Sequence, residues 1–194
     1  MPTNKSQQPP AAASVMTDDH SEIDQLIHEL LAALDKGDRT QSFEHLDLLW
    51  ARLAVHIRAE HLWLFPSILE APRANFAGNG GAPLYEEAQS AIDLLRQDHD
   101  FFMRELAQAV NTMRNHGTVS DPVVINGLLR EVRRCVVRVE TRLQTHNQLE
   151  EEQVYMWVDA LLGEAERSAL TASMRHELEN LPRRFQPSLK KDFY

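Results

Sequence analysis

Apolar residues recur at helical spacing in four long stretches of this 194-residue chain. Steps of three and four residues alternate within each stretch, which places the apolar side chains on one face of an α-helix. Breaker residues separate the stretches: Gly37, the Pro- and Gly-containing segment 71–83, and Gly117. The pattern therefore predicts four long helices, at residues 18–35, 40–70, 84–115 and 120–162.

Two short connections and one longer one favour an all-α fold, an up-down-up-down four-helix bundle with a long loop between helices 2 and 3. Residues 1–17 contain polar residues, Pro and Ala and lack this periodicity, so we expect a flexible N-terminal tail. Residues 18–162 form the predicted bundle. Residues 163–194 are expected to add a short C-terminal helix and a tail.

The charge and composition of the chain exclude several classes of partner and site. The chain carries a formal net charge of −9, which argues against nucleic-acid or anionic membrane partners because both require clustered basic residues. A single Cys excludes an internal disulfide and a Cys-pair zinc site. The chain has no apolar run of about 20 residues and no apolar signal core near its start, so we expect a cytoplasmic protein.

The positions of the histidines indicate a site inside the predicted bundle. Of the nine histidines, four fall in phase with the apolar stripes, one on each predicted helix, and on helices 2 and 4 a Glu follows four residues later. The second and fourth helices also repeat one pattern, Leu-x-x-His-x-x-x-Glu-x-x-x-x-aromatic, at residues 53–65 and 143–155. The six core-facing candidates are His20, His56, Glu60, His99, His146 and Glu150.

These residue types at this spacing point to a metal. A His and a Glu four residues apart lie one turn from each other on one helix face, so both reach the same ion. Buried carboxylates and imidazoles without partners would cost several kcal/mol each, roughly, unless they pair or bind cations. Mixed nitrogen and oxygen donors suit iron or manganese better than calcium or structural zinc. Such a site leaves room for a bridging oxygen and a small exogenous ligand.

The predicted heights of the histidines test this arrangement. The candidates on helices 1 and 2 lie 17 residues before and 19 residues after Gly37, so they share one level in an antiparallel hairpin. In the second hairpin the separations from Gly117 are 18 and 29 residues, an excess of roughly 16 Å at about 1.5 Å per residue. The excess disappears if residues 120–125 form a separate turn, so a helix break is predicted near Asn126–Gly127.

The order His, HxxxE, His, HxxxE resembles the hemerythrin-like (HHE cation-binding) domain. Residues 53–66 are especially similar to that family's HxxxE-xxxxFP signature, and the resemblance covers residues 18–162. It implies a di-iron centre of two iron ions with an oxo or hydroxo bridge, for which manganese or zinc can substitute. The implied terminal ligands are His20, His56, His99 and His146, with Glu60 and Glu150 as bridges.

Two departures separate this chain from the oxygen-carrying members of that family. They have a second His where this chain has Met103, and a final Asp where it has Glu150. The chain resembles the four-His, two-Glu subgroup, which includes iron-centre repair proteins. Those repair proteins commonly carry a Cys-bearing N-terminal domain that these 194 residues do not contain.

The resemblance implies binding or sensing of O2, nitric oxide or peroxide at an open iron position. Peroxide decomposition or iron-centre repair at the same site is the alternative, so enzymatic activity stays open. A third reading is a helical interaction module, with a homodimer through the C-terminal helix.

Several assignments stay open at the level of residues. His28 competes with His20 as the ligand on the first helix, although it lies one position off the apolar stripe. His61 and Glu151 flank the two bridging Glu residues, and we expect them to hydrogen-bond to ligands instead of binding metal. The set of six could also be a bundle core whose polar residues happen to pair.

Overall fold

The computed structural model describes residues 11–76, 81–117 and 119–185. Within these residues every regular element is helical, which confirms the all-helical prediction. The long helices are α1 (Ala11–Lys36), α2 (Arg39–Ala59), α4 (Tyr85–Asn115) and α5 (Pro122–Leu149). None of the described helices combines the length and the apolar run that a membrane span requires.

Two of the long helices continue through a short π-helical turn. After α2 come the π turn η1 (Glu60–Leu64) and α3 (Phe65–Leu69), and after α5 come the π turn η3 (Glu150–Val154) and α6 (Tyr155–Leu161). The 3-10 helix η2 (Arg73–Asn75) lies in the long connection to α4. A last helix, α7 (Glu164–Leu178), is followed by the 3-10 turn η4 (Arg183–Phe185).

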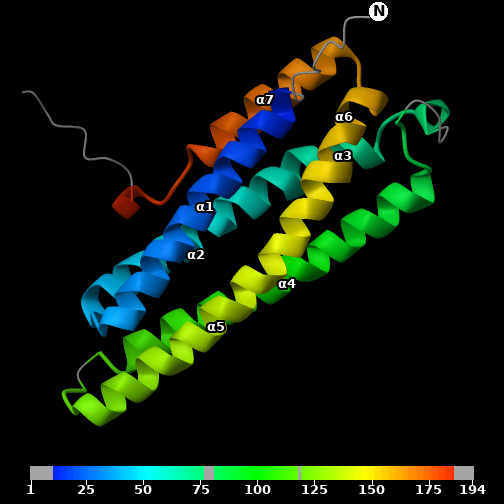
Figure 1. Cartoon of the computed structure of the whole chain (residues 1–194). Coiled ribbons are helices and arrows are strands. Elements are labelled where there is room, and N and C mark those ends of the chain that lie inside the picture. The colour runs from blue at the N-terminus through cyan, green and yellow to red at the C-terminus, as the bar shows by residue number, and fades with distance from the viewer. Residues whose placement is uncertain (1–10, 77–80, 118, 186–194) are drawn as a thin grey trace, which may run out of the picture.

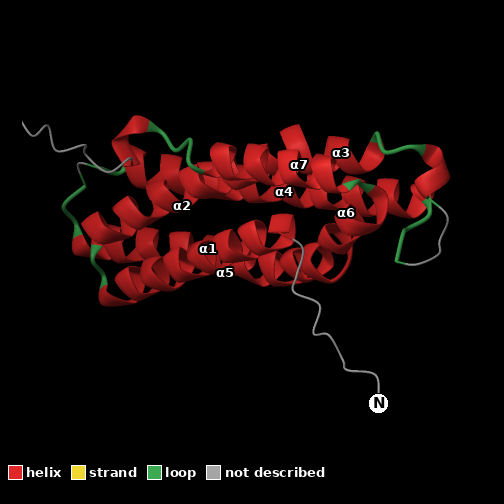
Figure 2. Cartoon of the chain, turned by 90° about the horizontal axis from the view of Figure 1, so that it is seen from above, coloured by secondary structure: helices red, strands yellow, loops and turns green. Residues whose placement is uncertain are grey.

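The long helices lie side by side, as Figures 1 and 2 show. α1 packs against α2 and α5, and α4 packs against α5 and α2. The fifth long element, α7, packs against α1 and α2. Its apolar face is buried within the chain at Leu170, Met174 and Leu178, so the homodimer expected through this helix stays a prediction that would have to use its exposed side.

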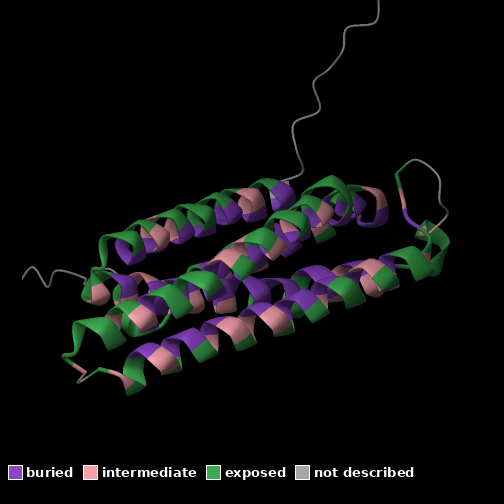
Figure 3. Cartoon of the chain, turned by 60° about the horizontal axis from the view of Figure 1, so that its bottom comes forward, coloured by how far each residue is buried: buried purple, intermediate pink, exposed green. Residues whose placement is uncertain are grey.

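Each helix buries one stripe and exposes the opposite side (Figure 3). The buried apolar residues form two clusters. One includes Met16, Phe65, Ile92 and Trp157 and lies where α3, α6 and α7 pack. The other includes Leu30 and runs through the opposite halves of α1, α2, α4 and α5.

The predicted N-terminal tail is partly helix. α1 begins at Ala11, seven residues before the predicted start, and residues 1–10 lie outside the described part of the chain. Ala12, Ala13 and Met16 are buried in the first apolar cluster. The prediction for residues 11–17 was wrong because this segment is rich in small apolar residues, whose burial depends on α3, α6 and α7 and not on local periodicity.

The predicted break near Asn126–Gly127 was also wrong. α5 runs without interruption from Pro122, and Asp121 caps it by accepting a hydrogen bond from the backbone N–H of Val123. The longer separation of His146 from Gly117 is instead taken up by exposed helix at the start of α5. Val123 is 76% exposed, and burial begins only at Leu128. The first turns of α5 therefore extend beyond the packed core.

Candidate metal centre

The six candidate residues meet in one buried layer between the two apolar clusters. They come from the middle of α1 and α4, from the ends of α2 and α5, and from the first positions of both π turns. None is more than 3% exposed. The structure thus brings together all six: His20, His56, Glu60, His99, His146 and Glu150.

Both carboxylates lie between a histidine of the first hairpin and one of the second. Glu60 Oε1 is 3.5 Å from His56 Nε2, and its Oε2 is 3.1 Å from His99 Nε2. Glu150 Oε2 is 3.2 Å from His20 Nε2, and its Oε1 is 3.2 Å from His146 Nε2. Each Glu therefore lies between two histidines that belong to different hairpins.

Donor atoms gather in two overlapping groups. Glu60, His99, His146 and Glu150 offer atoms that all lie within 4.8 Å of one another, and His20, His56 and Glu150 do the same. Glu150 belongs to both groups. Each group could hold a metal ion.

In each of the four candidate histidines, Nδ1 points away from the carboxylates and has a polar partner. His56 Nδ1 lies 2.8 Å from Asp19, and His146 Nδ1 lies 3.2 Å from Asp98. With Nε2 facing the centre, each Nδ1–H donates to the neighbouring carboxylate, which fixes the tautomer and the ring orientation. Arg52 and Arg142 in turn donate to these two aspartates.

The other two histidines have different outer partners. His20 Nδ1 lies 2.8 Å from Glu151 Oε1, and His99 Nδ1 lies 2.9 Å from Nε2 of His61. Glu151 and His61, which flank the two Glu residues in the sequence, therefore each contact a candidate ligand, as expected.

The π turns explain how the helices continue past the site. In η1 the backbone N–H of Phe65 donates to the carbonyl of Glu60, and in η3 that of Tyr155 donates to the carbonyl of Glu150. Bonds over five residues widen the helix by one residue, and such turns occur frequently at functional sites. As a result, the aromatic residue five positions after each Glu also lies at the centre.

The two aromatic residues differ in chemistry. The Tyr155 hydroxyl lies 3.2 Å from His20 Nε2, 3.1 Å from Glu150 Oε2 and 3.3 Å from Glu60 Oε1. Phe65 instead stacks on His99, with ring centroids 5.9 Å apart. Phe102 meets His146 edge to face at 5.2 Å. One side of the centre thus holds a hydroxyl and the other side is apolar.

The electrostatics of the metal-free site are those of a buried ion-pair cluster. Burial opposes protonation of His146, but the charge of Glu150 and the hydrogen bond to Asp98 raise its pKa to about 10. Burial also opposes protonation of His56, but the charge of Glu60 outweighs it and raises the pKa of His56 well above its ordinary value. Burial opposes ionisation of Glu150, yet His146 holds the Glu150 pKa well below its usual range.

Two polar atoms remain without hydrogen bonds. Glu60 Oε2 and Glu150 Oε1 are buried and accept no hydrogen bond of suitable geometry from a described group, although His99 Nε2 and His146 Nε2 lie 3.1 and 3.2 Å away. A buried carboxylate oxygen left in this way is costly. A cation among these oxygens and the neighbouring imidazole nitrogens would satisfy them, so the residues present fit a metal.

The remaining alternatives from the sequence lie away from this layer. His28 is exposed, and its Nδ1 lies 2.8 Å from the backbone carbonyl of Asp24, so the structure places His20 and not His28 at the centre.

Asp19, Asp98 and Tyr155 were missed as site residues. Their signal was present in the repeats, because Asp-His occurs at 19–20 and 98–99 and an aromatic residue follows each Glu by five positions.

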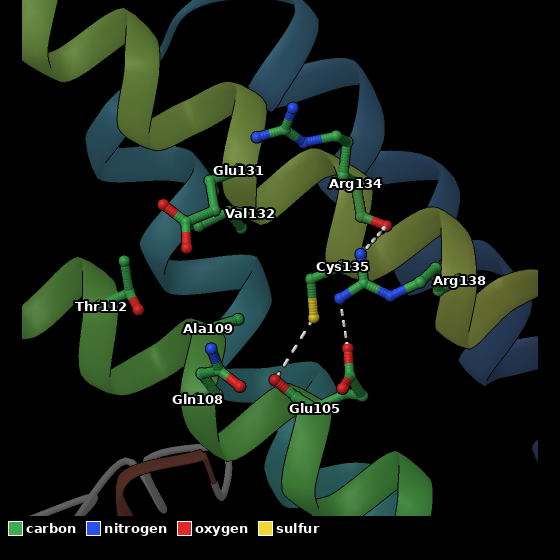
Figure 4. A pocket seen from close by; sticks show the side chains of 9 residues that line it. All are labelled: Glu105, Gln108, Ala109, Thr112, Glu131, Val132, Arg134, Cys135 and Arg138. Carbon is green, nitrogen blue, oxygen red and sulfur yellow. Dashed lines mark hydrogen bonds and ion pairs between the residues drawn. The ribbon is translucent and has the colours of Figure 1, made fainter.

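Cys135 lines a separate cavity of about 210 Å³ between α4 and α5 (Figure 4). Its Sγ donates a hydrogen bond to the backbone carbonyl of Glu105, and the Glu105 carboxylate pairs with Arg138. Burial, together with the charge of Glu105, raises the pKa of the thiol to about 11. Cys135 is therefore a buried, protonated thiol.

Fold and site together define an all-helical protein with a buried His/Glu cluster that could hold metal. Comparison with known proteins adds no closer assignment: no family model, no curated protein and no solved structure matches the chain.

Proposed function

We propose that this protein is a hemerythrin-like di-iron protein that binds or senses O2, nitric oxide or peroxide. One observation carries the proposal: two buried carboxylates each face a histidine from both helical hairpins. Four imidazoles and two carboxylates acting as bridges would provide four donors for each of two ions. Nitrogen and oxygen donors of this kind suit iron or manganese.

The packing of the long helices supports the corresponding fold. α1, α2, α4 and α5 each contact two of the others, in a closed circuit. Their order along the chain and their short connections fit an up-down-up-down four-helix bundle, which we propose as the topology. α7 then lies outside this bundle, against α1 and α2.

A di-iron centre bound here would supply reversible or redox chemistry toward small oxygen- or nitrogen-containing ligands. The chain's own residues would control that chemistry. Phe65 packs against His99, and Phe102 packs against His146, and the two rings limit access of water. The Tyr155 hydroxyl can donate to a carboxylate or to a small ligand that reaches the centre. Asp19 and Asp98 hold two imidazoles in the ligating orientation.

Anaerobic reconstitution with ferrous iron tests the proposal. We expect two iron ions per chain by native mass spectrometry and a new charge-transfer absorption when O2, peroxide or nitric oxide is added. Glu60→Ala and Glu150→Ala should lose iron while circular dichroism stays helical, and Glu152→Ala is the matched control because that exposed side chain bonds to Gln148 instead. A helical wild-type chain that binds no metal would overturn the proposal. Oxygen release from added peroxide would identify the enzymatic alternative.

A further inference from the structure

The two halves of the candidate centre are similar but not equivalent. We call His20 and His56 the first pair, and His99 and His146 the second pair. One histidine of each pair is held by an aspartate that is itself bound to an arginine. This part of the arrangement obeys the approximate two-fold symmetry of the sequence repeat.

The symmetry fails at the other histidine of each pair. His20 Nδ1 faces the carboxylate of Glu151, whose side chain is 38% exposed. His99 Nδ1 faces His61, an exposed imidazole. The outer partner of His99 is thus an imidazole, whereas that of His20 is a carboxylate. The first pair therefore has two carboxylate outer partners, and the second pair has one carboxylate and one imidazole.

We infer that the metal position at the first pair binds a divalent ion more tightly than the position at the second pair, and that Glu151 and His61 set this order of loading. The inference rests on the proposed metal-binding function and adds a role for two residues outside the ligand set.

The physical reason is the basicity of the ligating nitrogen. A carboxylate that accepts the Nδ1–H makes Nε2 a stronger donor, and losing such a partner typically costs about 10- to 100-fold in metal affinity. An imidazole nitrogen, as in His61, accepts the same hydrogen bond without adding negative charge. Glu151 therefore strengthens the first position relative to the second.

Donor geometry opposes this effect, but more weakly. The second position has four donors already gathered, whereas the first has three. The missing donor is close, since Glu60 Oε1 lies 3.5 Å from His56 Nε2 and 3.3 Å from the Tyr155 hydroxyl. A small movement of this carboxylate completes the first position, so the difference in charge decides the order.

Zinc titration followed by native mass spectrometry tests the inference without redox chemistry. Repulsion between two ions separates the binding steps even in a symmetric site, so the informative quantity is the change that each variant causes. Glu151→Gln should lower the affinity of the first, tighter binding step by about 10-fold or more. The affinities of the two steps then become more similar. His61→Glu should strengthen the second step and also bring them together. Glu152→Gln and His28→Glu are matched controls at exposed positions and should change neither step.

Single-position variants assign the steps to places. His99→Ala keeps the first pair and should retain the tighter affinity, whereas His20→Ala should retain the weaker one. Equal affinities in these two variants, or steps that respond to neither Glu151→Gln nor His61→Glu, would overturn the inference and leave the metal-binding proposal intact. A folded wild-type chain that binds no zinc and no iron would overturn the metal-binding proposal itself.

Discussion

The Tyr155 hydroxyl serves different purposes with and without a metal. In the metal-free protein it contacts both buried carboxylates, beside the imidazole nitrogens that face them. With an ion bound, the carboxylates have a cation as their partner, and the hydroxyl matters less to stability.

We therefore expect Tyr155→Phe to lower the free energy of unfolding of the metal-free protein by about 1–3 kcal/mol, the range for a lost hydrogen bond to a buried charged group. Urea denaturation with a chelator, and again with metal, measures both states. The loss should shrink in the metal-loaded protein. Tyr85→Phe is the control, because the Tyr85 hydroxyl donates to the neutral side chain of Gln89 in α4, away from the candidate centre. Equal losses in both states would contradict this account.

Among the elements, the start of α1 provides a direct test of packing. Met16 is 0% exposed within the first apolar cluster, although the sequence around it resembles a tail. Met16→Ala should lower the free energy of unfolding by roughly 2–4 kcal/mol, as for other buried Met or Leu side chains. The neighbouring exposed Ser14→Ala is the control. A Met16 variant as stable as wild type, measured by thermal or urea denaturation, would mean that this segment does not pack.

Continuity of α5 can be tested at Gly127. A Cβ added there meets no atom within 4 Å, and the residue lies in regular helix. Gly127→Ala should therefore raise the free energy of unfolding by about 0.4–1 kcal/mol. Gly37→Ala should do the opposite, because Gly37 has a φ of +74°. If thermal denaturation shows that Gly127→Ala is destabilising, the helix is broken there after all.

The sequence predicted most of the helices because long amphipathic periodicity depends on local spacing alone. It also predicted that His20, His56, His99 and His146 face inward, because they share that periodicity. The π turns were not predictable in this way, since one inserted residue shifts the phase without breaking the apolar pattern. The partners of Nδ1 were only partly accessible, because Asp19 and Asp98 act across helices.

On the scale of the whole molecule, the ionised cluster sets a pH dependence. The pKa of His146 is about 10 in the metal-free fold against an ordinary value of 6.5, so its stabilising contribution is complete below 6.5 and is lost as pH rises toward 10. Glu150 has a lowered pKa, so its contribution is present above its ordinary value of 4.5 and is lost only at lower pH. The metal-free protein should be most stable between these two ordinary values.

Urea denaturation with a chelator at about pH 6 and about pH 9 checks this expectation. Stability should be lower at the higher pH. Metal affinity should change in the opposite direction, because a bound ion replaces the proton on Nε2 and binding then releases protons. A metal-free protein that gains stability between these two pH values would contradict the ion-pair description.

The position of the polar layer has a consequence for cooperativity. The two apolar clusters lie on either side of the candidate centre, and within residues 11–76, 81–117 and 119–185 they are separate clusters. Ions held by residues from α1, α2, α4 and α5 would tie the two ends of the molecule into one unit that opens all at once. Without ions, the coupling between the ends rests on the ion-pair layer and the helix backbones, so the N-terminal turns of α1 together with α6 and α7 could open while the far end stays closed.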